Sequence, residues 1–169
     1  MKTRIIGLDP GLRRTGWGVI EVEGNSLGFL ASGTVNTDSK MPLASRLSQI
    51  FEGLLEVISK FTPNAAAVEE TFVNKNPKST LKLGQARGVV LLAPAHSGVP
   101  VAEYSATLIK KSIVGAGHAH KDQVQSMIKV LLPRARPNTK DEADALAVAV
   151  CHVHHSERQK LIFSRKQSL

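Results

Sequence analysis

The chain has 169 residues, a formal net charge of +8 and one cysteine. This length predicts one domain and excludes a two-domain kinase of the actin or sugar-kinase type, and one cysteine excludes an intrachain disulfide. The longest apolar stretches fall far short of a membrane span, so we expect a cytoplasmic protein.

The charge is unevenly distributed along the chain. Residues 71–169 hold 15 of the 22 basic residues but 6 of the 14 acidic residues. Such a surplus of Lys and Arg favours a polyanionic partner such as nucleic acid, although a solvated surface would carry the same charges. Aromatic residues make up 4% of the chain, which is too few for the stacking platforms that bind single strands.

The N-terminal part of the chain predicts three strands, a helix and a further strand. Apolar runs bounded by turn residues predict strands over 4–9, 15–22 and 27–35. Apolar residues spaced by three and four then predict an amphipathic helix over 42–61, and a strand over 64–69 follows it.

The C-terminal part predicts four helices and one strand. Asn76 and Pro77 are typical of a helix start, and Pro94 should kink or end that helix. The elements that follow are a strand over 99–104 and helices over 105–114, 121–132 and 139 to about 154.

This order of elements predicts an α/β fold with one mixed five-stranded sheet flanked by helices. The first three strands form an antiparallel meander, whereas crossover helices make the first, fourth and fifth strands parallel. Residues 1–155 should form this domain, and residues 156–169 a basic, flexible tail.

Several carboxylates stand in apolar surroundings. Asp9 and Glu69 end two of the predicted parallel strands, whose carboxyl ends lie side by side where α/β sheets bind ligands. Taken singly, each could be a turn residue or a solvated strand end. Asp141 and Asp144 share one face of the last helix, for which Thr139 is the expected N-cap. Because that helix is apolar nearly all round, Asp144 needs a cation, a proton or a buried partner.

A cluster of these acids would be strongly self-repulsive unless a cation bound to it. Oxygen-only ligands select hard cations, so Mg²⁺ or Mn²⁺ fits best. Two such ions can hold the attacking water and the leaving oxygen of a phosphodiester. An acidic metal site within a basic protein therefore predicts a nuclease.

Five motifs resemble, in the same order, those of the RuvC Holliday junction resolvases, over roughly residues 4–155. The family's fold is similar to ribonuclease H, in agreement with the predicted order of strands and helices. The motifs are Gly7-Leu8-Asp9-Pro10-Gly11 with Thr15-Gly16-Trp17-Gly18, Val68-Glu69-Glu70-Thr71-Phe72 with Lys75-Asn76, Leu83-Gly84-Gln85-Ala86-Arg87-Gly88, Gly115-Ala116-Gly117 followed by Lys121, and Asp141-Glu142-Ala143-Asp144-Ala145-Leu146-Ala147.

The resemblance implies a catalytic metal site, with two Mg²⁺ ions for which Mn²⁺ can substitute. It implies paired cleavage of two like strands at a four-way DNA junction in recombination and repair. It further implies a homodimer that works with a RuvA–RuvB branch-migration complex. The implied metal-binding and catalytic residues, called the four acids below, are Asp9, Glu69, Asp141 and Asp144. The motif selects Glu69 over Glu70, a choice that strand alternation alone leaves open.

The resemblance also implies residues that contact the DNA. Phe72 would be an exposed ring near the crossover, whereas the alternative is a core anchor. Lys121 would lie closest to the cut backbone and neutralise the transferring phosphate, with Lys110 near it and Lys111 ranked lower. The expected phosphate contacts on the loop and helix after Glu69, which could equally form a solvated face, are Lys75, Lys78, Lys82 and Arg87.

Two other functions stay open at this point. One is a different ribonuclease H-like nuclease that acts on RNA–DNA hybrids or flaps. The other is a non-catalytic junction-binding module, although a repulsive acidic cluster would serve no purpose there. His118 and His120 fit no zinc motif and are expected at the surface or at a helix end.

Overall fold

The computed structural model describes residues 2–71 and 76–166, with side chains through residue 156. In chain order the elements are β1 (Thr3–Asp9), β2 (Arg14–Glu23), β3 (Ser26–Asn36), α1 (Leu43–Phe61), β4 (Ala65–Glu69), α2 (Pro77–His96), β5 (Val101–Tyr104), α3 (Ala106–Val114), α4 (Lys121–Leu131) and α5 (Lys140–Lys166).

The five strands form one sheet in the order β3-β2-β1-β4-β5. β1 pairs antiparallel with β2 and parallel with β4, which pairs parallel with β5. The predicted mixed sheet is thus confirmed.

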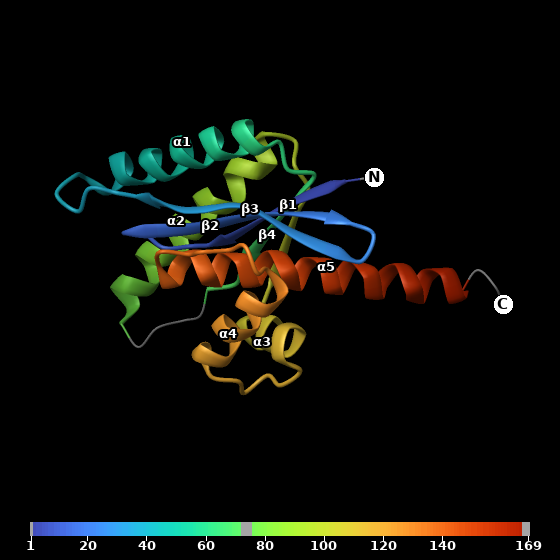
Figure 1. Ribbon diagram of the computed structural model, residues 1–169. Helices are drawn as coiled ribbons and strands as arrows, with labels where there is room; N and C mark the ends of the chain where they lie inside the picture. Colours follow the sequence, from blue (N-terminus) through green and yellow to red (C-terminus); the bar gives the residue numbers. More distant parts are fainter. Residues whose placement is uncertain (1, 72–75, 167–169) are drawn as a thin grey trace.

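The sheet lies between two helical layers (Figure 1). One apolar core joins the sheet to α1 and α2, and a second core joins its other face to α3, α4 and α5. Side chains of β1 alternate between these cores: Ile5 belongs to the α5 side, whereas Ile6 and Leu8 belong to the α1 side. None of the described helices is long and apolar enough to cross a bilayer.

Two helix ends differ from those predicted. α2 continues through Pro94 to His96, with Pro94 buried in the core. α5 continues to Lys166 rather than ending near His154, because the charged residues that follow are good helix formers. The domain boundary at 155 and the flexibility of the tail stay predictions.

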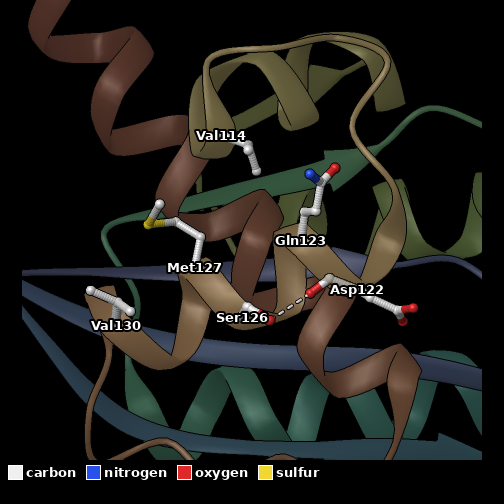
Figure 2. A pocket seen from close by; sticks show the side chains of 6 residues that line it. All are labelled: Val114, Asp122, Gln123, Ser126, Met127 and Val130. Atoms are coloured by element: carbon white, nitrogen blue, oxygen red, sulfur yellow. Dashed lines mark hydrogen bonds between the residues drawn. The ribbon is translucent and has the colours of Figure 1, made fainter.

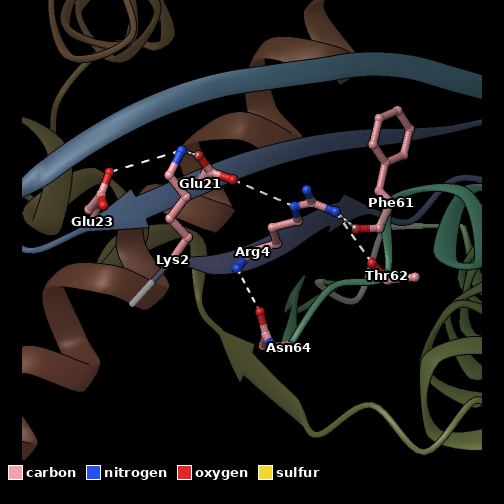
Figure 3. Close-up of polar contacts among 7 residues, drawn as sticks. All are labelled: Lys2, Arg4, Glu21, Glu23, Phe61, Thr62 and Asn64. Carbon is pink, nitrogen blue, oxygen red and sulfur yellow. Dashed lines mark hydrogen bonds and ion pairs between the residues drawn. The ribbon is translucent and has the colours of Figure 1, made fainter.

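A polar network fixes the sheet at the start of β1 (Figure 3). The Arg4 guanidinium donates to the Phe61 carbonyl at 3.0 Å and to Thr62 Oγ1 at 3.3 Å, and it pairs with Glu21 at 3.6 Å. The backbone N–H of Arg4 donates to Asn64 Oδ1 at 2.8 Å. These contacts hold the start of β1 and the neighbouring part of β2 against the turn between α1 and β4.

Glycines allow α5 to lie directly on the opposite end of the sheet. Gly7 and Gly18 face each other across β1 and β2. A Cβ atom on Gly7 would overlap the Ala145 carbonyl oxygen, and one on Gly16 would overlap the Asp141 carbonyl oxygen. This close approach puts the first turns of α5 beside the carboxyl end of β1, where both acids of α5 lie.

Candidate active site

Asp9 and Glu69 stand at the ends of adjacent parallel strands and face α5. Ile5 and Ala67 belong to the core on the α5 side of the sheet. Because strand side chains alternate with a period of two, Asp9 and Glu69 lie on that same side. Glu70 is the next residue along the chain, so this alternation does not direct it toward α5, and it is exposed. The geometry therefore favours Glu69 over Glu70, as the motif does.

The N-terminus of α5 carries the other two acids. Thr139 Oγ1 accepts a hydrogen bond from the Glu142 backbone N–H at 3.2 Å, which confirms the predicted N-cap. The Glu142 carboxylate is buried and accepts from Ser32 Oγ of β3 at 2.7 Å. These bonds hold the first turn of α5 against β3, and so fix the direction in which Asp141 and Asp144 project.

The four acids act on one another electrostatically. Burial, followed by the charges of Glu69, Asp144 and Asp141, raises the pKa of Asp9 to about 8, while the Lys121 charge opposes this shift. Burial and the Asp144 charge likewise raise the pKa of Glu69. Residues that lie far apart in the sequence are therefore close enough in the fold to influence one another's charge.

Two basic side chains pair with the acids of α5. Lys121 Nζ donates to Asp144 Oδ2 at 3.1 Å, and the charge of Asp144 raises the pKa of Lys121. Arg14 donates to Asp141 Oδ2 at 3.2 Å. The positive charge of Lys110 lies close enough to Glu69 to offset part of the rise in its pKa. The sequence gives no sign of the Arg14 contact, because its partner lies 127 residues away.

The four acids fit a hard divalent cation by their chemistry. All donors are carboxylate oxygens, and Asp9 and Glu69 have a raised pKa, first because they are buried and then because other carboxylates lie near them. In the described part of the chain, no three His, Cys, Asp or Glu side chains are arranged as a ready metal site. The carboxylates of Asp141 and Asp144 pair instead with Arg14 and Lys121.

The other predicted DNA contacts have different surroundings. Lys78 and Lys82 are exposed on α2, which suits a phosphate contact. Arg87 instead pairs with Glu103 of β5, so it ties α2 to the sheet edge. Lys110 is half-buried and Lys111 is exposed. Phe72 and Lys75 lie outside the described residues.

A separate hollow lies between α3 and α4 (Figure 2). Its volume is about 430 Å³, and none of the four acids lines it. Ser126 Oγ donates to the Asp122 carbonyl at 2.8 Å within its wall. The backbone N–H of His120 donates to Gln123 Oε1 at 2.9 Å, so His120 is a helix-end residue, as expected. The acids thus lie outside this hollow, at the sheet end.

The raised pKa of Asp9 predicts a pH-dependent stability in metal-free buffer. Between about pH 4 and the folded pKa of about 8, the folded state holds a proton that the unfolded state has lost. The free energy of unfolding should therefore fall as the pH rises through this range. Asp9→Asn should flatten the dependence. Urea unfolding in EDTA at pH 5 and pH 8.5 measures how the free energy of unfolding changes with pH in the wild type and in Asp9→Asn. The same change in both proteins would contradict the placement of Asp9 among the other acids.

Comparisons with known proteins find close relatives across nearly the whole chain. The family described as crossover junction endodeoxyribonuclease RuvC matches residues 5–152. The proteins of that name from Xanthobacter autotrophicus and Brucella ovis are similar to the chain. The first is 64% identical over 90% of the chain and 90% of the relative. The second is 58% identical over 96% of the chain and 93% of the relative.

A solved structure resembles the chain in the same way. It is Thermus thermophilus RuvC in complex with a Holliday junction substrate, with a TM-score of 0.87 and 34% identity. The match covers 93% of this chain and 96% of that protein. The five-stranded sheet and its flanking helices are therefore the ribonuclease H-like arrangement expected from the motifs.

Proposed function

Because this chain belongs to the RuvC family of crossover junction endodeoxyribonucleases, we propose that it resolves four-way DNA junctions by Mg²⁺-dependent hydrolysis at the four acids. The observation that carries the proposal is the convergence of these acids, from β1, β4 and α5, at one end of the sheet. A protein of net charge +8 gains nothing from such a cluster unless it binds a cation.

Each element of the site has a separate part in the proposed reaction. The four acids would hold two Mg²⁺ ions, which would activate the attacking water and stabilise the leaving oxygen. Lys121 is 68% exposed at the edge of the cluster, so its ammonium group can reach a phosphate as well as Asp144. Lys110, beside Glu69, adds positive charge near the same phosphate.

Substrate comparison tests the proposal. With Mg²⁺, the protein should cut a mobile four-way junction in two like strands and leave linear duplex and RNA–DNA hybrid largely uncut. EDTA should abolish cutting, and Mn²⁺ should restore it. Preference for the hybrid would favour the alternative ribonuclease activity, whereas binding without cutting would favour a non-catalytic module.

Paired cleavage suggests a homodimer, and α2 offers a surface for it. Leu81 and Leu92 are 66% and 54% exposed, and their spacing puts them on one side of the helix. Gly84 and Gly88 have open space around them, so a second helix could approach closely. Self-association through α2 would give the dimer two active sites. A RuvA–RuvB complex is the further partner that the family implies.

Leu81→Asp should convert the proposed dimer into monomers, because it buries a charge in an apolar helix contact. The matched control is Val130→Asp, since Val130 is an apolar residue of α4 with a comparable exposure of 69%. Light scattering coupled to gel filtration gives the masses. A dimeric Leu81→Asp variant would exclude α2 as the interface.

Lys78→Ala combined with Lys82→Ala should weaken binding to all junction sequences alike. If both lysines contact phosphates, the slope of log K against log salt should decrease by up to about two. The control is Lys40→Ala combined with Lys129→Ala; both lysines are exposed, Lys40 in the turn between β3 and α1 and Lys129 on α4. Fluorescence anisotropy over a salt series measures the slopes, and an unchanged slope would assign both residues to a solvated face.

A further inference from the structure

Asp141 and Asp144 of α5 each form an ion pair with a basic side chain. Lys121, at the start of α4, pairs with Asp144, and Arg14, at the start of β2, pairs with Asp141. Asp9 and Glu69 have no ion pair with any residue that the structure describes. Of these residues, Arg14 alone lies outside the family motifs and has no part in the proposed reaction.

The fold holds Arg14 close to Asp141. Gly16, two residues after Arg14, lies so near the Asp141 backbone that a Cβ atom there would overlap its carbonyl oxygen. The first turn of α5 and the first residues of β2 are therefore in direct contact. Arg14 and Asp141 remain partly exposed, with side-chain exposures of 44% and 35%, so a solvated ion can reach their carboxylate and guanidinium groups.

We propose that Arg14 competes with the divalent metal ion for the Asp141 carboxylate. In the metal-free protein the guanidinium balances the charge of Asp141 and holds its carboxylate at the edge of the acidic cluster. When the metal binds, Asp141 exchanges Arg14 for the ion, so Arg14 sets the metal concentration at which the site fills. This inference rests on the metal site proposed above and adds a residue to it.

Competition predicts that loss of Arg14 tightens metal binding. Arg14→Gln removes both the competing ion pair and a positive charge near the site, so we expect the dissociation constant for Mg²⁺ to fall about fivefold. The matched control is Arg13→Gln. Arg13 is exposed, carries the same charge, and makes no side-chain hydrogen bond or ion pair within the described residues. Its removal should leave the dissociation constant nearly unchanged.

Calorimetric titration of the full-length, DNA-free protein with Mg²⁺ alone measures these constants. In an Asp141→Asn background the effect of Arg14→Gln should become much smaller, because the contested carboxylate is gone and only the loss of a nearby positive charge still contributes. In EDTA, Arg14→Gln should melt below Arg13→Gln, and excess Mg²⁺ should raise its melting temperature more. These melts also verify that the variants are folded.

The outcomes separate this inference from the proposed function. If the wild-type protein and Arg14→Gln both fail to bind Mg²⁺, the proposed metal site fails. If the wild type binds Mg²⁺, Asp9→Asn weakens binding and Arg14→Gln leaves it unchanged, the metal site stands and the competition is overturned. Weaker binding by Arg14→Gln would also overturn it, because Arg14 would then position Asp141 for the metal.

Discussion

Asn in place of Asp9 or Asp144 should lower the rate of junction cleavage about a thousandfold or more, because loss of a metal ligand removes several kcal/mol of transition-state stabilisation. Junction binding should be retained or strengthened, since each change removes a negative charge from a site that faces phosphates. Single-turnover cleavage and gel-shift assays measure the two effects separately.

Matched acidic residues provide the controls for this loss of cleavage. Glu70 is exposed and adjacent to Glu69, and Asp122 is exposed and adjacent to Lys121. Glu70→Gln and Asp122→Asn should therefore cut at nearly the wild-type rate. Near wild-type cutting by Asp9→Asn would remove Asp9 from the catalytic site, and the same result for Asp144→Asn would remove Asp144.

The stability of these variants in EDTA depends on their partners. Asp144→Asn loses its ion pair with Lys121, so some destabilisation is expected even without metal. Asp9 has no ion pair within the described residues, and its charge is opposed by burial and by three other acids. Asp9→Asn is therefore the variant in which relief of repulsion should be seen directly.

Gly7→Ala should destabilise the protein by about 3 kcal/mol, which is the upper part of the range for overpacked sites. The added methyl group would overlap the Ala145 carbonyl oxygen and contact Ala149. Since Ala145 and Ala149 both belong to the buried part of α5, the helix must shift away from the sheet. This shift would also move Asp141 and Asp144 from Asp9, so cleavage should fall even where the variant is folded.

Gly28→Ala is the control for this effect. Gly28 is also a strand residue, but the nearest atom to an added Cβ lies 3.6 Å away, which is an ordinary contact. Its free energy of unfolding should change by less than about 0.5 kcal/mol. Urea unfolding measures the free energy of unfolding of Gly7→Ala and Gly28→Ala. Equal stability of the two would mean that Gly7 does not set the distance between α5 and the sheet.

Local sequence patterns were sufficient to predict most of the fold. The period-two strands and the three-and-four spacing of the helix over 42–61 correspond to β1 through β4 and α1. Asp144 was recognisable as a site residue because a charge inside an apolar helix requires a partner. The strand ends predicted only that Asp9 and Glu69 lie side by side, since neighbouring parallel strands end together. The family motifs were needed to choose them as site residues, because each alone could be a turn residue or a solvated strand end.

Contacts between distant segments could not be predicted from these patterns. Gly7 looks like any strand glycine until α5 is placed on it. The ion pair of Arg87 with Glu103 is a second such contact, because it depends on the packing of α2 against β5. The Arg14–Asp141 pair likewise depends on the packing of α5 against β2. Each of these is a consequence of tertiary structure, whereas strand and helix periodicities are local.

The most direct test of the account is a crystal structure of the wild-type protein grown with Mn²⁺, with anomalous differences measured at the manganese edge. We predict anomalous density between the four acids, with carboxylate oxygens about 2.1 Å from the ion and Asp141 no longer paired with Arg14. Density only at other places, with Arg14 and Lys121 still bound to Asp141 and Asp144, would contradict a metal site at this end of the sheet.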